Sequence, residues 1–159
     1  MNGVVHIETS GLKKHFKQTQ ALKGVSLNFS GGTLHGLIGP SGAGKTTLMR
    51  CLMGLMAPTS GAIKYFVNQH DQPFSNVRDF IAYMPQTQSL YADLSIGEHL
   101  EFFKEMYQIP DDEYESRKNN LLKITRLEKF QERSAGQLSG GMYKKLGLMC
   151  SLLRNPKVL

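Results

Sequence analysis

Apolar residues gather in two short stretches near the start of the chain, at residues 4–8 and 21–29. A polar, lysine-rich segment joins them, and Gly31-Gly32 follows the second stretch. Short apolar runs between turn-forming residues are typical of β-strands. We therefore expect two short strands joined by a turn, both at the edge of a sheet.

A compact apolar run at residues 34–38 stops at Gly39, and the residues up to Gly44 are unsuited to a strand or a helix. From Lys45 onward, apolar residues recur at intervals of three and four, which places them on one face of a helix. These residues are Leu48, Cys51, Leu52 and Leu55. The pattern predicts a buried strand, a glycine loop and a helix, in that order.

The remaining sequence predicts two strands and then three helices. The strands are at residues 63–67 and 80–84, with a polar turn at 68–75 between them. Helices are expected from 96 to 107, from 111 or 112 to near 130, and from Ser139 to the Asn155-Pro156 pair. The second helix is expected to turn Leu121, Leu122 and Ile124 inward, and the third Leu146, Met149, Cys150 and Leu153.

Local signals mark the start of the first helix and the last residues of the sequence. Ser95 followed by Glu98 makes a capping box for the first of these helices. The last three residues, 157–159, look like the start of another buried strand that stops early, so the sequence appears cut.

Composition limits the possible classes of protein. The chain has 159 residues, of which 40% are hydrophobic, so one domain is the default expectation. The formal net charge of +6 suits an anionic partner, but the bases are interspersed with other residues and do not indicate nucleic acid. The two cysteines, Cys51 and Cys150, are far apart and predict buried, reduced thiols. No apolar run reaches the length needed to cross a bilayer, so we expect a cytosolic chain that meets a membrane only through a partner.

Residues 39–46 match the phosphate-binding pattern G-x-x-x-x-G-K-[ST] in full, between a predicted strand and a predicted helix. Small residues allow backbone N–H groups to surround a polyphosphate, and the helix N-terminus adds partial positive charge. Lys45 supplies a full charge for the β and γ phosphates, Thr46 is the expected Mg²⁺ ligand, and Thr47 can donate to a phosphate oxygen. The residues expected to bind nucleotide here are Gly39, Pro40, Ser41, Gly42, Ala43, Gly44, Lys45, Thr46 and Thr47.

The sequence lacks the pattern that reads a guanine base. A GTPase requires the base-reading pattern N-K-x-D, and the nearest stretch, residues 76–79, lacks the lysine and precedes a predicted strand. The glycine loop alone does not distinguish kinases, motor ATPases and transporter ATPases. ATP with Mg²⁺ is the ligand that we expect, and the remaining sequence has to decide among these classes.

About ninety residues after this loop, the run Leu138-Ser139-Gly140-Gly141-Met142 resembles the LSGGQ signature of the ATP-binding cassette (ABC) ATPases. A serine and two glycines that open a helix make a second anion site. In the resembled family this site closes over the γ-phosphate held by another nucleotide-binding domain. The resemblance therefore assigns Ser139, Gly140 and Gly141 to nucleotide binding, and Ser139 with Lys45 to the catalytic site.

The resemblance covers nearly the whole chain and implies further roles. Phe16 matches the aromatic residue that stacks on adenine, and Gln86 matches a glutamine that reaches Mg²⁺ or the attacking water. The helical segment resembles the α-helical subdomain that faces the membrane partner. The implied fold is α/β, a P-loop NTPase core with an antiparallel β edge and an α-helical subdomain, an incomplete ABC ATPase fold. Its expected parts are 1–94 for the nucleotide-binding core, 95–137 for the helical subdomain and 138–159 for the signature helix and the start of the Walker B strand.

The sequence departs from the family pattern at two points. Met142 replaces the usual glutamine of the signature. The Walker B aspartate and glutamate and the switch histidine have no counterpart in the chain, so we expect it to bind ATP without efficient hydrolysis. The histidines are expected to be ordinary surface or core residues; they are His6, His15, His35, His70 and His99.

The function implied is that of an ATP-binding subunit or domain of an ABC transporter. Its expected partners are a second nucleotide-binding domain, as a homo- or heterodimer, and a membrane-spanning permease that holds it at the cytoplasmic face. The alternative is a soluble ABC-type ATPase that acts on ribosomes or nucleic acid. A short helical insert without coiled-coil heptads favours transport.

Overall fold

The computed structural model describes residues 4–87 and 90–159. They form two compact units. The sheet unit contains residues 4–81 and Val158, and the helical unit contains the described residues of 82–157 and Leu159. The predicted boundaries at 94 and 137 follow functional parts of the family and stay predictions.

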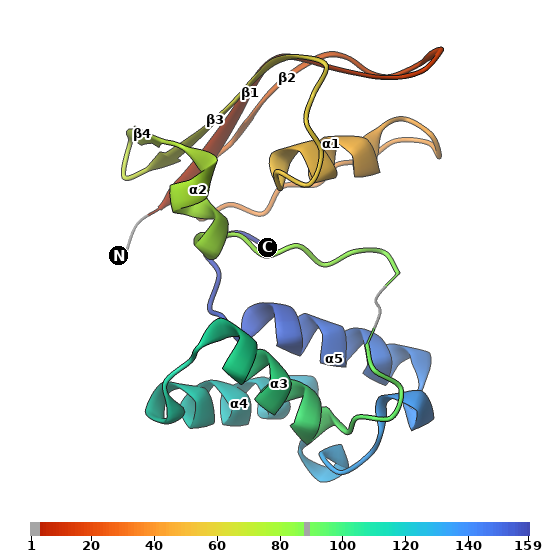
Figure 1. Ribbon diagram of the computed structural model, residues 1–159, viewed down its shortest axis with the longest axis vertical. Helices are drawn as coiled ribbons and strands as arrows, with labels where there is room; N and C mark the ends of the chain where they lie inside the picture. The colour runs from red at the N-terminus through yellow and green to blue at the C-terminus, as the bar shows by residue number, and fades with distance from the viewer. Residues whose placement is uncertain (1–3, 88–89) are drawn as a thin grey trace. The chain divides into compact units, whose positions relative to one another are not determined.

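The sheet unit is built on four antiparallel strands in the order β2-β1-β3-β4 (Figure 1). Their bounds are β1 Val5–Phe16, β2 Thr19–Phe29, β3 Ser60–Val67 and β4 His70–Gln72. The first two strands are longer than expected, because the lysine-rich segment continues them. Side chains of this segment alternate between the two faces of the sheet, so that Leu12 is fully buried while Lys13 is exposed. An antiparallel sheet permits this because one of its faces can be exposed to solvent. The expectation that β1 lies at an edge is wrong, since it pairs with both β2 and β3.

Helix α1, Lys45–Leu52, packs against one face of this sheet. Its buried residues Leu48, Cys51 and Leu52 confirm most of the predicted face. Leu55 is 63% exposed because the helix ends three residues before it. The phenol of Tyr65 on β3 donates to the Leu52 carbonyl at 2.8 Å, which satisfies one of the unpaired carbonyls at the helix end.

The predicted buried strand at residues 34–38 is not formed. These residues have no regular structure, and Leu34 and Ile38 are 99% and 96% exposed. A buried strand requires neighbours on both edges, and no strand among the described residues pairs with this segment. The run is therefore apolar as the sequence shows, but its side chains are not covered by any element of the described structure.

Two further predictions, of one strand and one turn, are also corrected. In the run at 80–84 only Ile81 pairs, in a parallel bridge with Val158, and a short 3-10 helix occupies Arg78–Phe80. The segment read as a polar turn contains β4 and the one-turn helix α2, Phe74–Val77. Val77 is fully buried and Phe74 packs against the same core, so two apolar residues of α2 anchor it to the sheet unit.

The helical unit contains α3 Ile96–Tyr107, α4 Asp111–Thr125 and α5 Gly140–Leu152. The capping box at Ser95 and Glu98 is present in both directions, and the core includes Leu100, Leu122 and Leu146. Ile124 is 70% exposed, contrary to the prediction, because α4 turns Tyr114, Leu122 and Thr125 inward. That helix ends at Thr125 and not near residue 130, since Arg126 adopts a left-handed conformation.

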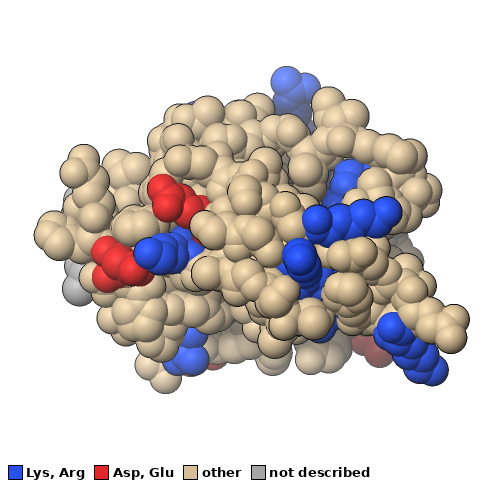
Figure 2. Space-filling view, turned by 90° about the horizontal axis from the view of Figure 1, so that it is seen from above, with Lys and Arg blue, Asp and Glu red and all other residues tan. Residues whose placement is uncertain are grey.

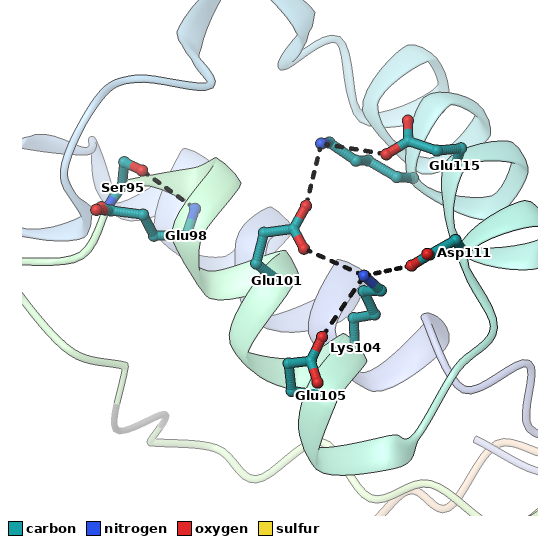
Figure 3. Close-up of polar contacts among 8 residues, drawn as sticks. Ser95, Glu98, Glu101, Lys104, Glu105, Asp111 and Glu115 are labelled. Carbon is teal, nitrogen blue, oxygen red and sulfur yellow. Dashed lines mark hydrogen bonds and ion pairs between the residues drawn. The ribbon is translucent and has the colours of Figure 1, made fainter.

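Charged side chains connect α3 and α4 (Figure 3). The ammonium groups of Lys104 and Lys118 each lie 5.2 Å from the centre of the buried Tyr114 ring. The Lys104 ammonium lies 2.6 Å from a carboxylate oxygen of Asp111 and 3.8 Å from one of Glu101. The hydrogen bond with Asp111 is the largest of the effects that raise the pKa of Lys104. Lys118 approaches the same Glu101 at 3.6 Å, so one carboxylate joins the lysines of two helices.

Candidate functional site

The glycine loop lies directly before α1 in the sheet unit, as predicted. Gly42 has φ +78° and Gly44 has φ +89°, values that L-residues with a side chain rarely adopt. A Cβ on Gly44 would lie 2.3 Å from the Ala21 carbonyl oxygen on β2. The loop thus needs glycine at Gly44 for two reasons, its conformation and its close approach to the sheet.

The side chain of Lys45 folds back over this loop. Its ammonium donates to the carbonyl oxygens of Gly39 at 2.6 Å and of Pro40 at 2.7 Å. An ammonium has three N–H donors, so one remains for an oxygen of a ligand. The arrangement holds a full positive charge at the loop, where the N-terminus of α1 adds its partial positive charge.

The first turn of α1 supplies two hydroxyls next to this charge. Thr46 is exposed and Thr47 is half-buried. Mg²⁺ usually keeps several waters and takes few protein ligands, so a single exposed hydroxyl fits it. Among residues 4–87 and 90–159, no group of three or more His, Cys, Asp or Glu side chains is placed to hold a metal ion.

Strand β2 and the loop together line a cavity of about 380 Å³. Sequence reasoning missed this wall, because a strand pattern does not say which loop the strand will face. The cavity is lined by Gln20, Ala21, Leu22, Lys23, Val25, Gly42 and Ala43.

Phe16 lies at the end of β1 in the same unit and is 43% exposed. It pairs with Thr19, and the neighbouring pair joins His15 to Gln20, which lines the cavity. The backbone of Phe16 is therefore one residue pair away from Gln20 in the strand register. Lys14 places its ammonium 5.3 Å from the centre of this ring.

The sheet unit has a strongly positive stretch around the loop. No acidic residue occurs between Glu8 and Asp71 in the sequence. The basic residues of that stretch are Lys13, Lys14, Lys17, Lys23, Lys45, Arg50 and Lys64. Figure 2 shows basic side chains spread over the face seen from above, with acidic ones sparser. This imbalance favours an anionic ligand.

The other predicted site residues belong to the helical unit. Gln86 is exposed and lies in a bend without regular structure. Ser139 is the N-cap of α5, and its hydroxyl oxygen accepts from the Met142 N–H at 3.3 Å. Met142 is half-buried and packs against the helical core, so the residue that departs from the family pattern has a structural role here.

Gly140 and Gly141 open α5 with their backbone exposed, and an added Cβ would meet no atom within 4 Å at either position. The N–H groups of the first helical turn have no partner within the helix, so this exposed start can accept an anion. The structure therefore places the glycine loop at residues 39–47, from here on the P-loop, and Phe16 in the sheet unit. Gln86 and the signature at residues 138–142 lie in the helical unit.

The histidines agree with the expectation of ordinary roles. His99 is fully buried, with one ring nitrogen 2.8 Å from the Ser95 carbonyl oxygen and the other accepting from the Tyr91 N–H. His15, His35 and His70 are exposed. Both cysteines are buried and free, as predicted.

Comparison with known proteins identifies the family. The model of the ABC transporter family matches residues 22–159. ABC transporter G family member 20 of Dictyostelium discoideum is 35% identical over 153 residues, which are 96% of this chain and 21% of that protein. The probable multidrug ABC transporter ATP-binding protein YbhF of Escherichia coli K12 is 38% identical over 161 residues, which cover 100% of this chain and 28% of that protein.

Solved structures agree. An ATP-binding subunit of an ABC transporter superposes with a TM-score of 0.80 at 32% identity, covering 94% of this chain and 62% of that one. The cbiO1 protein of Clostridium perfringens, part of the transporter complex cbiONQ, gives a TM-score of 0.78 at 25% identity, with the same coverage of both chains.

The family match and the superposed structures place the chain in the class of the ABC ATPases, with a mixed α/β fold made of an antiparallel sheet and a group of helices. The chain belongs to the ABC transporter family, and it corresponds to part of that family's ATP-binding domain. It spans only about a fifth to a quarter of the length of the first curated relatives it matches. None of the described helices combines the length and apolar character needed to cross a membrane.

Proposed function

We propose that the chain binds ATP with Mg²⁺ at residues 39–47 and forms part of the ATP-driven component of an ABC transporter. The observation that supports this most is the position of Lys45. Its ammonium is held by two loop carbonyls at the start of α1, with one donor left for a phosphate oxygen. A triphosphate tail is the ligand whose charge and oxygen atoms fit such a loop.

Different residues would bind the phosphates, the Mg²⁺ ion and the adenine base. Backbone N–H groups of the loop and of the first turn of α1 would contact the phosphates, and the Thr46 hydroxyl would hold Mg²⁺. The ion, when bound, neutralises part of the phosphate charge. Phe16 would stack on adenine, because its ring is 43% exposed and its backbone is one residue pair from Gln20, which lines the cavity beside the loop.

The signature and Gln86 would act when a second nucleotide-binding domain approaches. Ser139, Gly140 and Gly141 present an open helix start with room for an incoming phosphate. Gln86 is exposed, so its carboxamide is free to reach Mg²⁺ or water. Closure and separation of two such domains would pull on a membrane permease, which would hold the chain at the cytoplasmic face.

We expect the 159-residue chain by itself to bind ATP far better than it hydrolyses it. Lys45, Gln86 and Ser139 can orient groups and stabilise charge, but none is a general base for water near neutral pH. General-base assistance is worth roughly 10²–10⁴-fold in rate, so turnover should be slow even where binding is tight.

The test replaces Lys45 by alanine and measures binding of a fluorescent ATP analogue with Mg²⁺. Lys45→Ala should remove most of the affinity, because it removes the charge held at the loop. Lys64→Ala, at an exposed lysine on β3, is the matched control for loss of one positive charge. Equal binding by Lys45→Ala and the control would refute the phosphate assignment.

A further inference from the structure

The ammonium of Lys14 lies between two parts of the sheet unit, the β1–β2 hairpin and the turn that follows α1. Lys14 is half-buried on β1, whereas its neighbours Lys13 and His15 are exposed. Its Nζ donates to the Ala57 carbonyl oxygen at 2.7 Å, in the turn that follows α1, and lies 5.3 Å from the centre of the Phe16 ring. One charged group thus contacts both the hairpin and this turn.

Backbone contacts on either side hold this arrangement in place. The Thr59 N–H donates to the Lys13 carbonyl at 2.8 Å, and the His15 N–H donates to the Thr59 hydroxyl at 3.0 Å. The backbone of β1 is therefore tied to the turn both before and after Lys14. A surface lysine usually extends its head group into water, but this one is directed to a fixed carbonyl.

The charge of Lys14 also acts on the helix that begins at the P-loop. Burial raises the pKa of the Cys51 thiol on α1, and the positive charge of Lys14 opposes that rise. Lys14 therefore joins the hairpin to the turn that directly follows α1.

We propose that Lys14 is a positioning residue for the adenine base, which holds the Phe16 ring in place for stacking. The inference rests on the proposed function, in which Phe16 contacts adenine. A cation is attracted to the face of an aromatic ring, and a ring has two faces, so the ammonium can occupy one and leave the other for a base. A ring that is already held loses less side-chain freedom when the base binds.

This role predicts a specific pattern of affinities. Lys14 should matter for a ligand that has a base and not for one that has only phosphates. Adenosine triphosphate and inorganic tripolyphosphate, each with Mg²⁺, are the two probes that separate these cases. A general effect of positive charge would alter the binding of both.

The experiment compares three variants of the 159-residue chain by displacement of a fluorescent nucleotide. Lys14→Met should lose roughly two- to fivefold in ATP affinity, with tripolyphosphate affinity unchanged. Lys14→Arg keeps the cation and should stay within about twofold of the parent for both probes. Lys13→Met removes the same charge from the exposed neighbour and should leave the ratio of the two affinities unchanged. If Lys14→Met lowers the melting temperature, Lys14→Gln, which keeps an N–H donor without the charge, takes its place.

Two results would overturn the inference. Lys14→Met could leave ATP affinity unchanged, or it could weaken ATP and tripolyphosphate equally, as a residue that only supports the loop would do. Phe16→Ala keeps these results distinct from failure of the proposed function. If Phe16→Ala lowers the affinity for ATP alone while Lys14→Met does not, only the role of Lys14 is wrong. If the parent chain binds neither probe, the proposed function fails as well.

Discussion

Replacing Gly44 by alanine should destabilise the sheet unit more than the same change at Gly42. Both glycines have positive φ, so alanine at either position costs about 1–2 kcal/mol in a left-handed conformation. The loss of unfolded-state freedom that partly offsets this cost is the same for both, so it cancels in the comparison.

The two positions differ in their surroundings. A Cβ on Gly44 would lie 2.3 Å from the Ala21 carbonyl oxygen and 3.2 Å from a methyl group of Leu22, while one on Gly42 would meet nothing within 4 Å. Overpacking of this kind adds roughly 1–3 kcal/mol, because backbone on β2 has to shift. We therefore expect Gly44→Ala to be less stable than Gly42→Ala by roughly 1–3 kcal/mol.

The assay is thermal unfolding followed by circular dichroism, with each variant measured beside the parent chain. For a protein of this size, 1 kcal/mol corresponds to about 2–4 °C, so the two melting temperatures should differ by several degrees. ATP affinity should fall further in Gly44→Ala, since the loop must move away from β2. Equal melting temperatures would mean that the loop does not pack against β2, and the reasoning from this contact would be wrong.

Three further predictions concern the helical unit and the thiols. Ser95→Ala should cost about 1 kcal/mol in urea unfolding. A hydrogen bond from the Ser95 backbone N–H, and second to it one with the Ser95 side chain, hold the pKa of Glu98 below its usual 4.5, so the parent should lose stability as pH falls through that lowered pKa. The variant keeps the backbone bond and loses only the side-chain one, so its loss of stability in acid should be slightly smaller. A variant with the same acid sensitivity as the parent would contradict this. Ser139→Arg should leave ATP binding by the single chain intact and prevent its ATP-dependent pairing with a second cassette, measured by light scattering. Undiminished pairing would refute the assignment of a second anion site at Ser139. Burial raises the pKa of Cys150 to about 12 and also raises that of Cys51, so neither thiol should react with a disulfide reagent at pH 8 before unfolding, and labelling of the native chain would show that they are accessible.

Much of the helical unit could be predicted because its signals are local. The capping box of Ser95 and Glu98 satisfies backbone groups within four residues, and it sets the start of α3 whatever packs around it. Ser139 likewise caps α5 from the position that its sequence indicates. The direction of Ile124 was predicted wrongly, since the inward face of α4 depends on the helices beside it and not on the nearest apolar residues.

The candidate site also has parts that local sequence predicts and parts that depend on tertiary contacts. The motif alone locates the loop at residues 39–47, because glycines with positive φ and a lysine at a helix start are requirements of the local backbone. The wall at β2 and the contact of Lys14 with Ala57 join residues far apart in sequence, and no local pattern indicates them.

The sequence by itself determined the P-loop, the capped helices and the family, since each depends on residues that are neighbours along the chain. Only the tertiary structure decided that β1 lies inside the sheet and that residues 34–38 stay outside it. Both apolar segments have the composition of a strand. A strand is stable only when another strand accepts and donates its backbone hydrogen bonds, and β1 has two such partners while the described structure supplies none for residues 34–38.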